Sequence, residues 1–244
     1  MLQDKSVEIE RGREILEDAE WLWGWGTTAG KLRAERRAGI LIDMANMVKG
    51  RRVLEIGCGT GMFTRKISKK RVDLAAVDIS HDLLRKAKQE VDIPEVEFVQ
   101  SDIEQMPFGN MTFDAVVGIC VLHHLNMDAI LPEVRRVLKK GGRIVFCEPN
   151  MMNPQLLVQK NVKTIKKIRI LGETPEETAF FRWKLSNDLK RVGFTDISIV
   201  PFDFLHPWTP PFMIPVVNKI GTLAEKMPLI KEIAGSLIIN AFVK

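Results

Sequence analysis

Short apolar runs and amphipathic segments alternate along the middle of the chain, between residues 50 and 150. Apolar runs that stop at glycines or acidic residues are typical of buried strands. In the segment 128–139, Leu131, Val134 and Leu138 keep the spacing of a helix packed on a surface. The alternation predicts a parallel α/β sheet with helices on both faces. The predicted strands are 53–56, 72–78, 96–100, 113–120 and the run after Gly141-Gly142 up to Asn150, and the predicted helices are 62–69, 81–89 and 128–139.

The pattern changes after Pro149. Asn153-Pro154 has the form of a helix cap followed by a proline at the first helical position. In the insertion at about 151–171, apolar residues then alternate with five basic ones. This basic stretch is typical of a surface helix, of a lid over an anionic substrate, or of a segment that touches a membrane. The basic residues are Lys160, Lys163, Lys166, Lys167 and Arg169.

The last third of the chain predicts two further strands separated by an unusual insertion. A helix over 178–191 ends at Gly193, and residues 194–200 alternate as a sixth strand. Residues 203–234 are rich in proline and apolar side chains, and helices are expected over 211–226 and 228–233. This insertion is too apolar to be a free loop, so we expect it to cover the mouth of a site, a second copy of the chain or a lipid surface. Residues 235–244 then form the final strand.

The first 49 residues are predicted to form a helical cap on the 50–202 core. Three tryptophans, Trp21, Trp23 and Trp25, precede a basic helix expected over 31–48. The tryptophans are suited to pack this helix onto the sheet, and the arginines of the helix are either solvated or turned towards a ligand.

Composition narrows the class of protein. The 244 residues are 45% hydrophobic and 27% charged, as in a soluble globular domain, and the formal net charge of +5 does not by itself indicate a nucleic-acid partner. Cys58, Cys120 and Cys147 form no C-x-x-C pattern, which argues against a disulfide framework or a zinc site. The charged amino terminus lacks the apolar stretch of a signal peptide, and no apolar run is long enough to cross a bilayer. We therefore expect a cytoplasmic protein without a metal.

The first strand leads into Gly57-Cys58-Gly59-Thr60-Gly61, with Glu55 two places before the first glycine. Such a turn lets a ligand approach bare backbone N–H groups at the start of a helix, so a polar or anionic small molecule is the expected occupant. The dinucleotide pattern G-x-G-x-x-G would need a glycine at Met62, and no G-x-x-x-x-G-K-[ST] is present. Asp78, at the tip of the second strand, is placed either to accept hydrogen bonds from a ribose or to cap the next helix.

The pattern E-x-G-x-G-x-G resembles motif I of the class I S-adenosylmethionine-dependent methyltransferases. The pieces over about 50–150 match that family in order and spacing, and most resemble its methyltransferase type 11 group. The resemblance implies a Rossmann-like, doubly wound, seven-stranded sheet that is mostly parallel, with an antiparallel last strand beside the sixth. It also implies S-adenosylmethionine as cofactor, with S-adenosylhomocysteine as product.

The resemblance carries binding roles to particular positions. It puts Asp78 on the ribose with Ile79 beside the adenine. It puts Asp102 on the adenine amino group with Ile103 covering the ring, and a turn residue is the alternative for Asp102. Arg33, Arg36 or Arg37 is a candidate to pair with the cofactor carboxylate, and a solvated arginine remains the alternative. The full set of cofactor-binding candidates is Glu55, Gly57, Cys58, Gly59, Gly61, Asp78, Ile79, Asp102, Ile103, Ile119, Cys120 and Arg37.

Methyl transfer from a sulfonium needs alignment and exclusion of water, and a hydroxyl acceptor also benefits from a general base. His123 and His124 follow the fourth strand where the family places the methyl donor, and we favour His124, with a structural role as the alternative for both. Glu148, at the end of the fifth strand, is a candidate to bind substrate, to act as base or to cap the following turn. His206 is a further candidate from the apolar insertion.

The acceptor is expected to be small, and amphiphilic or lipid-linked. The chain has Cys-Val-Leu-His where amino-methylating DNA and RNA enzymes carry Asn/Asp-Pro-Pro-aromatic, and no cysteine follows a proline. Sequence-specific nucleic acid is therefore not an expected partner, whereas peripheral membrane contact and a homodimer are candidate interactions. Two other functions stay open, a catalytically inactive cofactor-binding regulatory or assembly protein and a nucleotide-cofactor oxidoreductase.

Overall fold

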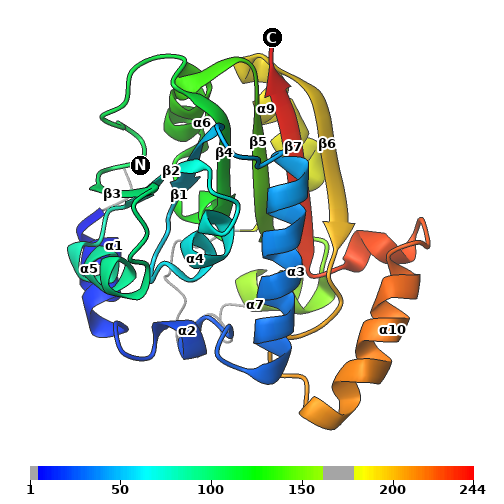
Figure 1. The fold of residues 1–244 in the computed structure, drawn as a ribbon. Helices are drawn as coiled ribbons and strands as arrows, with labels where there is room; N and C mark the ends of the chain where they lie inside the picture. Colours follow the sequence, from blue (N-terminus) through cyan, green and yellow to red (C-terminus); the bar gives the residue numbers. More distant parts are fainter. Residues whose placement is uncertain (1–4, 162–178) are drawn as a thin grey trace.

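The computed structural model of the protein describes residues 5–161 and 179–244, and a seven-stranded sheet forms its centre (Figure 1). The strands are β1 (Arg52–Ile56), β2 (Asp73–Asp78), β3 (Val96–Gln100), β4 (Phe113–Ile119), β5 (Leu138–Pro149), β6 (Phe194–Phe202) and β7 (Ser236–Val243). Their order is β3-β2-β1-β4-β5-β7-β6. Strands β1 to β5 pair in parallel, and β7 runs antiparallel between β5 and β6. The predicted fold class, with its antiparallel last strand, is confirmed.

Helices surround this sheet. The amino-terminal segment forms α1 (Lys5–Glu14), α2 (Ala19–Leu22) and α3 (Thr28–Met44). The crossovers contain α4 (Met62–Ser68), α5 (His81–Glu90) and α6 (Met127–Val137), and α7 (Pro154–Asn161), α9 (Arg182–Val192) and α10 (Ile214–Ala224) follow β5. Short 3-10 turns are η1 (Leu122–His124), η2 (Pro211–Met213) and η3 (Ile230–Ile233).

Successive side chains of the central strands pack into separate apolar clusters on the two faces of the sheet. Val53 packs with Leu41 of α3 and Ile67 of α4, whereas Leu54 packs with Leu131 of α6 and with residues of α9. This is the alternation expected of a strand buried on both sides. The prediction of helices on both faces is confirmed.

Several boundaries differ from the predicted ones. The helix predicted over 128–139 ends at Val137, because Leu138 has an extended backbone and pairs with Phe113 in the sheet. The helix predicted over 211–226 divides into η2 and α10, and η3 begins at Ile230. The sixth strand continues to Phe202.

The predicted cap of α7 is confirmed, since the Asn153 side chain accepts hydrogen bonds from the backbone N–H groups of Gln155 and Leu156. Of the predicted basic insertion, residues 162–171 lie outside the described residues. Figure 1 shows α2 and α7 beyond the end of the sheet towards which β6 points, so both decorations gather at the carboxyl edge of the parallel strands.

Candidate active site

The carboxyl ends of the parallel strands border one cavity of about 630 Å³. Open α/β sheets bind their ligands at this edge. The strand ends and the turns after them supply Gly57, Asp78, Asp102, Ile119, Pro149 and Asp203 to the wall. The amino-terminal segment supplies the opposite wall, including Glu8, Trp23, Trp25 and Arg37.

The glycine loop after β1 forms the floor of the cavity. Gly57, Gly59 and Gly61 all have positive φ, of 66°, 53° and 79°. A Cβ at Gly57 would lie 2.4 Å from Val121 Cγ2, so this position excludes any side chain. Gly61 is the N-cap of α4 and does not line the cavity.

Asp78 ties the glycine loop to the end of β2. Its carboxylate accepts hydrogen bonds from the backbone N–H groups of Gly59, at 2.8 Å, and Ser80, at 2.9 Å. Burial raises the pKa of Asp78, and the two backbone donors act in the opposite direction. A carboxylate has about four acceptor sites, so Asp78 keeps capacity for a ligand hydroxyl in the cavity that it lines.

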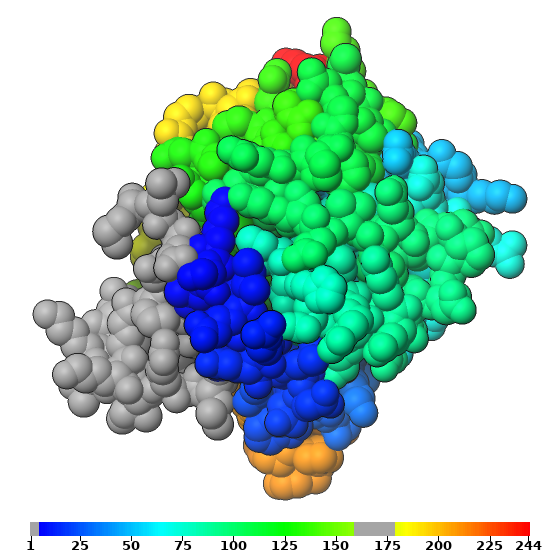
Figure 2. All heavy atoms as spheres, turned by 90° about the vertical axis from the view of Figure 1, so that its left-hand side faces the viewer, coloured from blue at the N-terminus to red at the C-terminus, as the bar shows by residue number. Residues whose placement is uncertain are grey.

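The next strand end is held by the amino-terminal helix. Asp102, after β3, forms an ion pair with Lys5 of α1, and Lys5 also lies 3.0 Å from Glu104. Ile79 and Ile103 contribute apolar wall beside this pair. In Figure 2, α1 lies against the surface formed by the segment of α5, and both carry residues of the cavity wall.

A buried ionic cluster closes the other end of the cavity. Asp203 accepts hydrogen bonds from Arg37 at 2.8 Å and from Arg33 at 2.9 Å, and Arg37 also donates to Ser236 Oγ at 2.6 Å. The Arg37 guanidinium lies over the rings of Trp25 and Phe202.

This cluster contains two guanidiniums for one carboxylate. Burial would raise the pKa of Asp203, but the charges of Arg37 and Arg33 hold it below its usual value. Arg36, the third arginine predicted as a candidate, instead forms a two-pronged ion pair with Glu225. The cavity end near Arg37 therefore carries a surplus of positive charge.

The two histidines of η1 have different carboxylate partners. His123 Nδ1 lies 2.8 Å from Glu148 Oε2, and Glu148 Oε1 accepts the backbone N–H groups of Val121 and Leu122. Glu148 is fully buried, so it fixes both the turn and the ring of His123. Because an ionised carboxylate only accepts, Nδ1 is assigned as the protonated nitrogen, and Nε2 is then the basic one.

His124 is paired with the amino-terminal helix. Its Nδ1 lies 3.3 Å from Glu8 Oε1 of α1, and the rings of His123 and His124 are 4.1 Å apart. Burial would raise the pKa of Glu8, but the hydrogen bond and charge of His124 lower it. His124 thus joins the cap to the sheet, whereas His123 is held by the sheet itself.

Two residues of the cavity wall have strained backbones. Cys120, at the end of β4, has φ 53°, and Asp203, after β6, has φ 73°. Left-handed conformations of such residues gather at functional sites, where the surrounding structure imposes them. The Arg37 guanidinium reaches the Cys120 sulfur at 3.8 Å, so both strained residues contact the same side chain.

Most of the predicted cofactor positions meet at this cavity. Those that line it are Gly57, Cys58, Gly59, Asp78, Ile79, Asp102, Ile103, Ile119, Cys120 and Arg37, and both predicted histidines line it as well. Glu55 does not. It is buried in β1 below the loop, where burial raises its pKa to about 8. His206 lines the rim and contacts Gln155.

Sequence reasoning missed Asp203 and the contacts of α1. An acidic residue at the tip of a strand was the signal that singled out Asp78, and Asp203 lies one residue beyond the end of β6. Among the residues that the structure describes, no group of three or more histidines, cysteines or acids could hold a metal. In the same part of the chain, no helix has the length and apolar character to cross a membrane.

Comparison with known proteins identifies the family. The family model of the methyltransferase domain matches residues 54–146. A demethylmenaquinone methyltransferase of Renibacterium salmoninarum is 32% identical over 120 residues, which are 49% of this chain and 49% of that protein. A fatty-acid O-methyltransferase of Mycolicibacterium smegmatis is 33% identical over 104 residues, 41% of this chain and 38% of the relative. The matches thus span about half or less of these curated relatives.

A longer match comes from an uncharacterized protein of Methanocaldococcus jannaschii, which is 32% identical over 200 residues, 72% of this chain and 76% of that protein. The crystal structure of a SAM-dependent methyltransferase of Thermotoga maritima, described as a possible histamine N-methyltransferase, shares the fold. Its TM-score is 0.68 at 18% identity, over 96% of this chain and 97% of that one. The chain therefore belongs to the class I S-adenosylmethionine-dependent methyltransferases.

Proposed function

We propose that this protein transfers a methyl group from S-adenosylmethionine to a small amphiphilic acceptor, and that His123 takes the proton which the acceptor loses. The observation that carries the proposal is the His123–Glu148 pair in the wall of the cavity that the glycine loop floors. A carboxylate that orients a histidine is a common arrangement for a general base that works near neutral pH.

The residues present fit the cofactor. The glycine loop leaves bare backbone at Gly57, Asp78 offers acceptor capacity for a ribose, and the guanidinium of Arg37 offers charge for a carboxylate. The cavity volume lies within the usual range for a small-molecule site. The bound cofactor supplies an activated methyl group, and the cap formed by residues 5–49 would exclude water from it.

His123 is the residue we assign to proton transfer, in preference to His124. Glu148 holds the ring and its tautomer, so Nε2 is the nitrogen that would take a proton from an acceptor hydroxyl or amine. His124 is occupied in joining α1 to the cavity wall through Glu8. Glu148 is a positioning residue in this proposal, because it acts through His123.

The proposed acceptor class follows from the wall and from the relatives. Apolar and aromatic side chains line the cavity beyond the glycine loop, among them Leu22, Trp25, Leu205 and Trp208. The names of two relatives specify a quinone and a fatty acid as their acceptors. An acceptor with an apolar body and one proton-bearing group suits such a wall.

The first experiment measures the cofactor by calorimetry. We expect S-adenosylhomocysteine to bind with micromolar or better affinity, and NADH and NADPH not to bind. The reverse result would identify an oxidoreductase and reject the proposal. Labelled methyl transfer to a panel of hydroxylated quinones, fatty acids and amino lipids then separates an enzyme from an inactive binding protein.

The second experiment tests the base. His123→Gln is expected to lower kcat by about 100-fold or more, in the range of a lost general base, with unchanged binding of S-adenosylhomocysteine. Glu148→Gln should lower kcat and move the acidic limb of the pH profile, where protonation of the base stops the reaction, and a merely structural role would not move that limb. His124→Gln is the matched control. An equal loss of kcat in that variant would contradict the assignment of His123 as the general base.

A further inference from the structure

The segment 208–233 presents an apolar surface to solvent. Ten of the twenty exposed large hydrophobic side chains in the described part of the chain lie in it, and Phe212 and Leu229 are 82% and 86% exposed. We call this set the apolar ridge. It consists of Trp208, Phe212, Met213, Val216, Ile220, Leu223, Met227, Leu229, Ile230 and Ile233. A contiguous patch of this kind marks a contact surface.

The ridge is the outer face of α10 and its flanking turns. Val216, Ile220 and Leu223 follow one another at four- and three-residue intervals, which places them on one side of α10. Met213 and Met227 lie just before and just after the helix. The inner side of α10 is buried where Gly221 packs closely against Phe204. Figure 1 shows α10 standing off from the sheet beyond β6, so the outer face is open.

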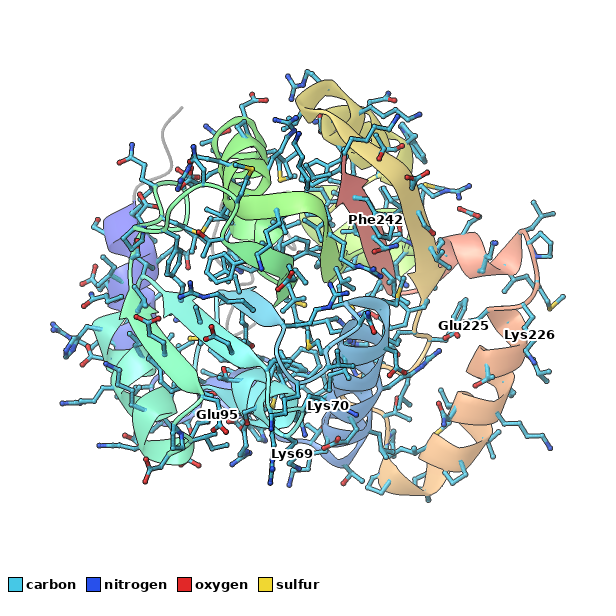
Figure 3. The ribbon with its side chains drawn as sticks, turned by 45° about the horizontal axis from the view of Figure 1, so that its top comes forward. Lys69, Lys70, Glu95, Glu225, Lys226 and Phe242 are labelled. Carbon is cyan, nitrogen blue, oxygen red and sulfur yellow. The ribbon has the colours of Figure 1, made fainter. Side chains whose placement is uncertain are left out.

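The charges of the segment are divided between its two sides. Its acidic residues turn inward, where Glu225 pairs with Arg36 and Glu232 pairs with Arg182. Lys219 and Lys226 are exposed beside the ridge. Figure 3 shows this division at adjacent positions, with Glu225 on the side of α10 towards α3 and Lys226 on the outer side. The outer surface is therefore apolar and positively charged.

The ridge is continuous with the rim of the cavity. Trp208 belongs to both, and its ring packs edge-to-face on Trp21 of α2 with centroids 4.7 Å apart. Both tryptophans are about half exposed. Tryptophan side chains of this kind are favoured at the boundary between lipid and water.

We propose that the apolar ridge docks on the surface of a bilayer that contains anionic lipid. The apolar stripe enters the headgroup boundary, and Lys219 and Lys226 face lipid phosphates. Charge decides against a second copy as the occupant, because two ridges packed face to face would bring lysines together with no exposed acidic partner in the segment. A docked bilayer would place the cavity rim beside a source of amphiphilic acceptor.

The experiment is co-sedimentation of the full chain with phosphatidylcholine vesicles, with and without phosphatidylglycerol. Binding is expected with phosphatidylglycerol and is expected to weaken as salt is raised. Ile220→Asp with Leu223→Asp should weaken it about 100-fold, since apolar burial supplies much of such binding. Val48→Asp with Met111→Asp is the matched control, because these side chains are also exposed but lie outside the ridge.

A second pair of variants tests the electrostatic contribution of the two lysines to vesicle binding. Lys219→Glu with Lys226→Glu is expected to weaken vesicle binding more than tenfold, because each lost lysine should weaken it about fivefold. Lys69→Glu with Lys70→Glu makes the same change of net charge on the exposed residues after α4, labelled in Figure 3, and should have a much smaller effect.

Three outcomes would overturn the docking proposal. The first is absence of wild-type binding at low salt, and the second is an equal loss in the control variants. The third is a dimer in sedimentation velocity that Ile220→Asp with Leu223→Asp abolishes, which would assign the ridge to a second copy. Calorimetry with S-adenosylhomocysteine is independent of all three, so failure here and failure of the proposed function are distinguishable.

Discussion

In the glycine loop after β1, Gly57 is the residue that we expect to tolerate substitution least. Gly57→Ala would hold alanine at positive φ, which destabilises the fold by about 1–2 kcal/mol. The added methyl group would also overpack Val121, which destabilises the fold by about 1–3 kcal/mol more. We expect the free energy of unfolding in urea to fall by the sum, about 2–5 kcal/mol, and binding of S-adenosylhomocysteine to be lost.

Gly141→Ala separates these two effects. Gly141 also has positive φ, of 72°, but an added Cβ would have nothing within 4 Å. Only the conformational part, about 1–2 kcal/mol, should be lost. If both variants lost the same free energy, the close approach of Gly57 to Val121 would have no energetic consequence.

Glu55 gives the protein a pH dependence of its own. Burial raises its pKa to about 8, and the charge of Asp78 adds to the effect, whereas the ordinary value is 4.5. The folded state then holds this proton more tightly than the unfolded state, so its contribution to stability falls as pH rises from 4.5 to about 8. Each tenfold difference in proton affinity between the two states corresponds to about 1.4 kcal/mol.

Glu55→Gln removes that proton equilibrium. The melting temperature of the variant relative to wild type is expected to increase steadily between pH 5 and pH 8 and to level off above about pH 8. Differential scanning calorimetry across this range provides the measurement. A difference that stays constant with pH would show that Glu55 ionises normally in the folded protein.

Helix α1 has few buried contacts compared with α3. Gly12 is its one buried residue, and ion pairs of Lys5 and Glu8 hold it over the cavity, whereas α3 buries six residues. Segments with little buried area open at low free energy. Amides of α1 should therefore exchange with deuterium much faster than those of α3, and S-adenosylhomocysteine should slow them.

Gly12→Leu tests whether docking or helix formation limits this exchange. A Cβ at Gly12 would lie 2.5 Å from Ser80 Oγ, so a leucine cannot seat α1 on α5. We expect α1 to exchange at the rate of an undocked helix in this variant, with α3 unchanged. Protection of α1 equal to that in wild type would contradict the docking role of Gly12.

The strands and crossover helices of the sheet could be predicted individually from the sequence, whereas the amino-terminal segment could be predicted only as a helical cap. Strand β3 lies at the residues predicted, because turn residues bound a β-rich apolar run. The end of α6 was wrong because the chain turns extended at Leu138 to pair with Phe113, and helical periodicity does not report that pairing. The polar face of α1 gives no apolar signal, so its place over the cavity was not predicted.

The same limit applies to the candidate site. The cavity floor follows from local chemistry, since glycines and an acid at strand ends meet wherever parallel strands end together. The partners of Arg37 do not follow from local chemistry. Asp203 and Ser236 lie 166 and 199 positions away in the sequence, and β6 and β7 bring them to Arg37. Pairing over such separations depends on the strand order, which the pattern of one sequence does not contain.

The cluster around Asp203 links the amino-terminal cap to both strands of the final hairpin. Asp203→Asn would leave two buried guanidiniums without their carboxylate, and we expect a loss of about 3–5 kcal/mol in the free energy of unfolding. Urea denaturation measures it.

Glu225→Gln is the comparison at a more exposed pair. Arg36 and Glu225 join the same parts of the chain, but Arg36 is 37% exposed, so solvent screens the pair and the loss should be about 1 kcal/mol or less. A loss in Asp203→Asn as small as that in Glu225→Gln would mean that the buried cluster does not hold the cap.

The hydrogen bond from Arg37 to Ser236 also fixes when the site can exist during synthesis. A ribosome-bound nascent chain that has not yet emerged as far as β7 has the glycine loop and both histidines. It lacks Ser236, and it lacks the strand that holds β6, and with it Asp203, in the sheet beside Arg37. The ligand-binding form would then arise only after the last hairpin has been translated. The ligand could stabilise the finished chain, but it could not guide the first strands as they fold on the ribosome.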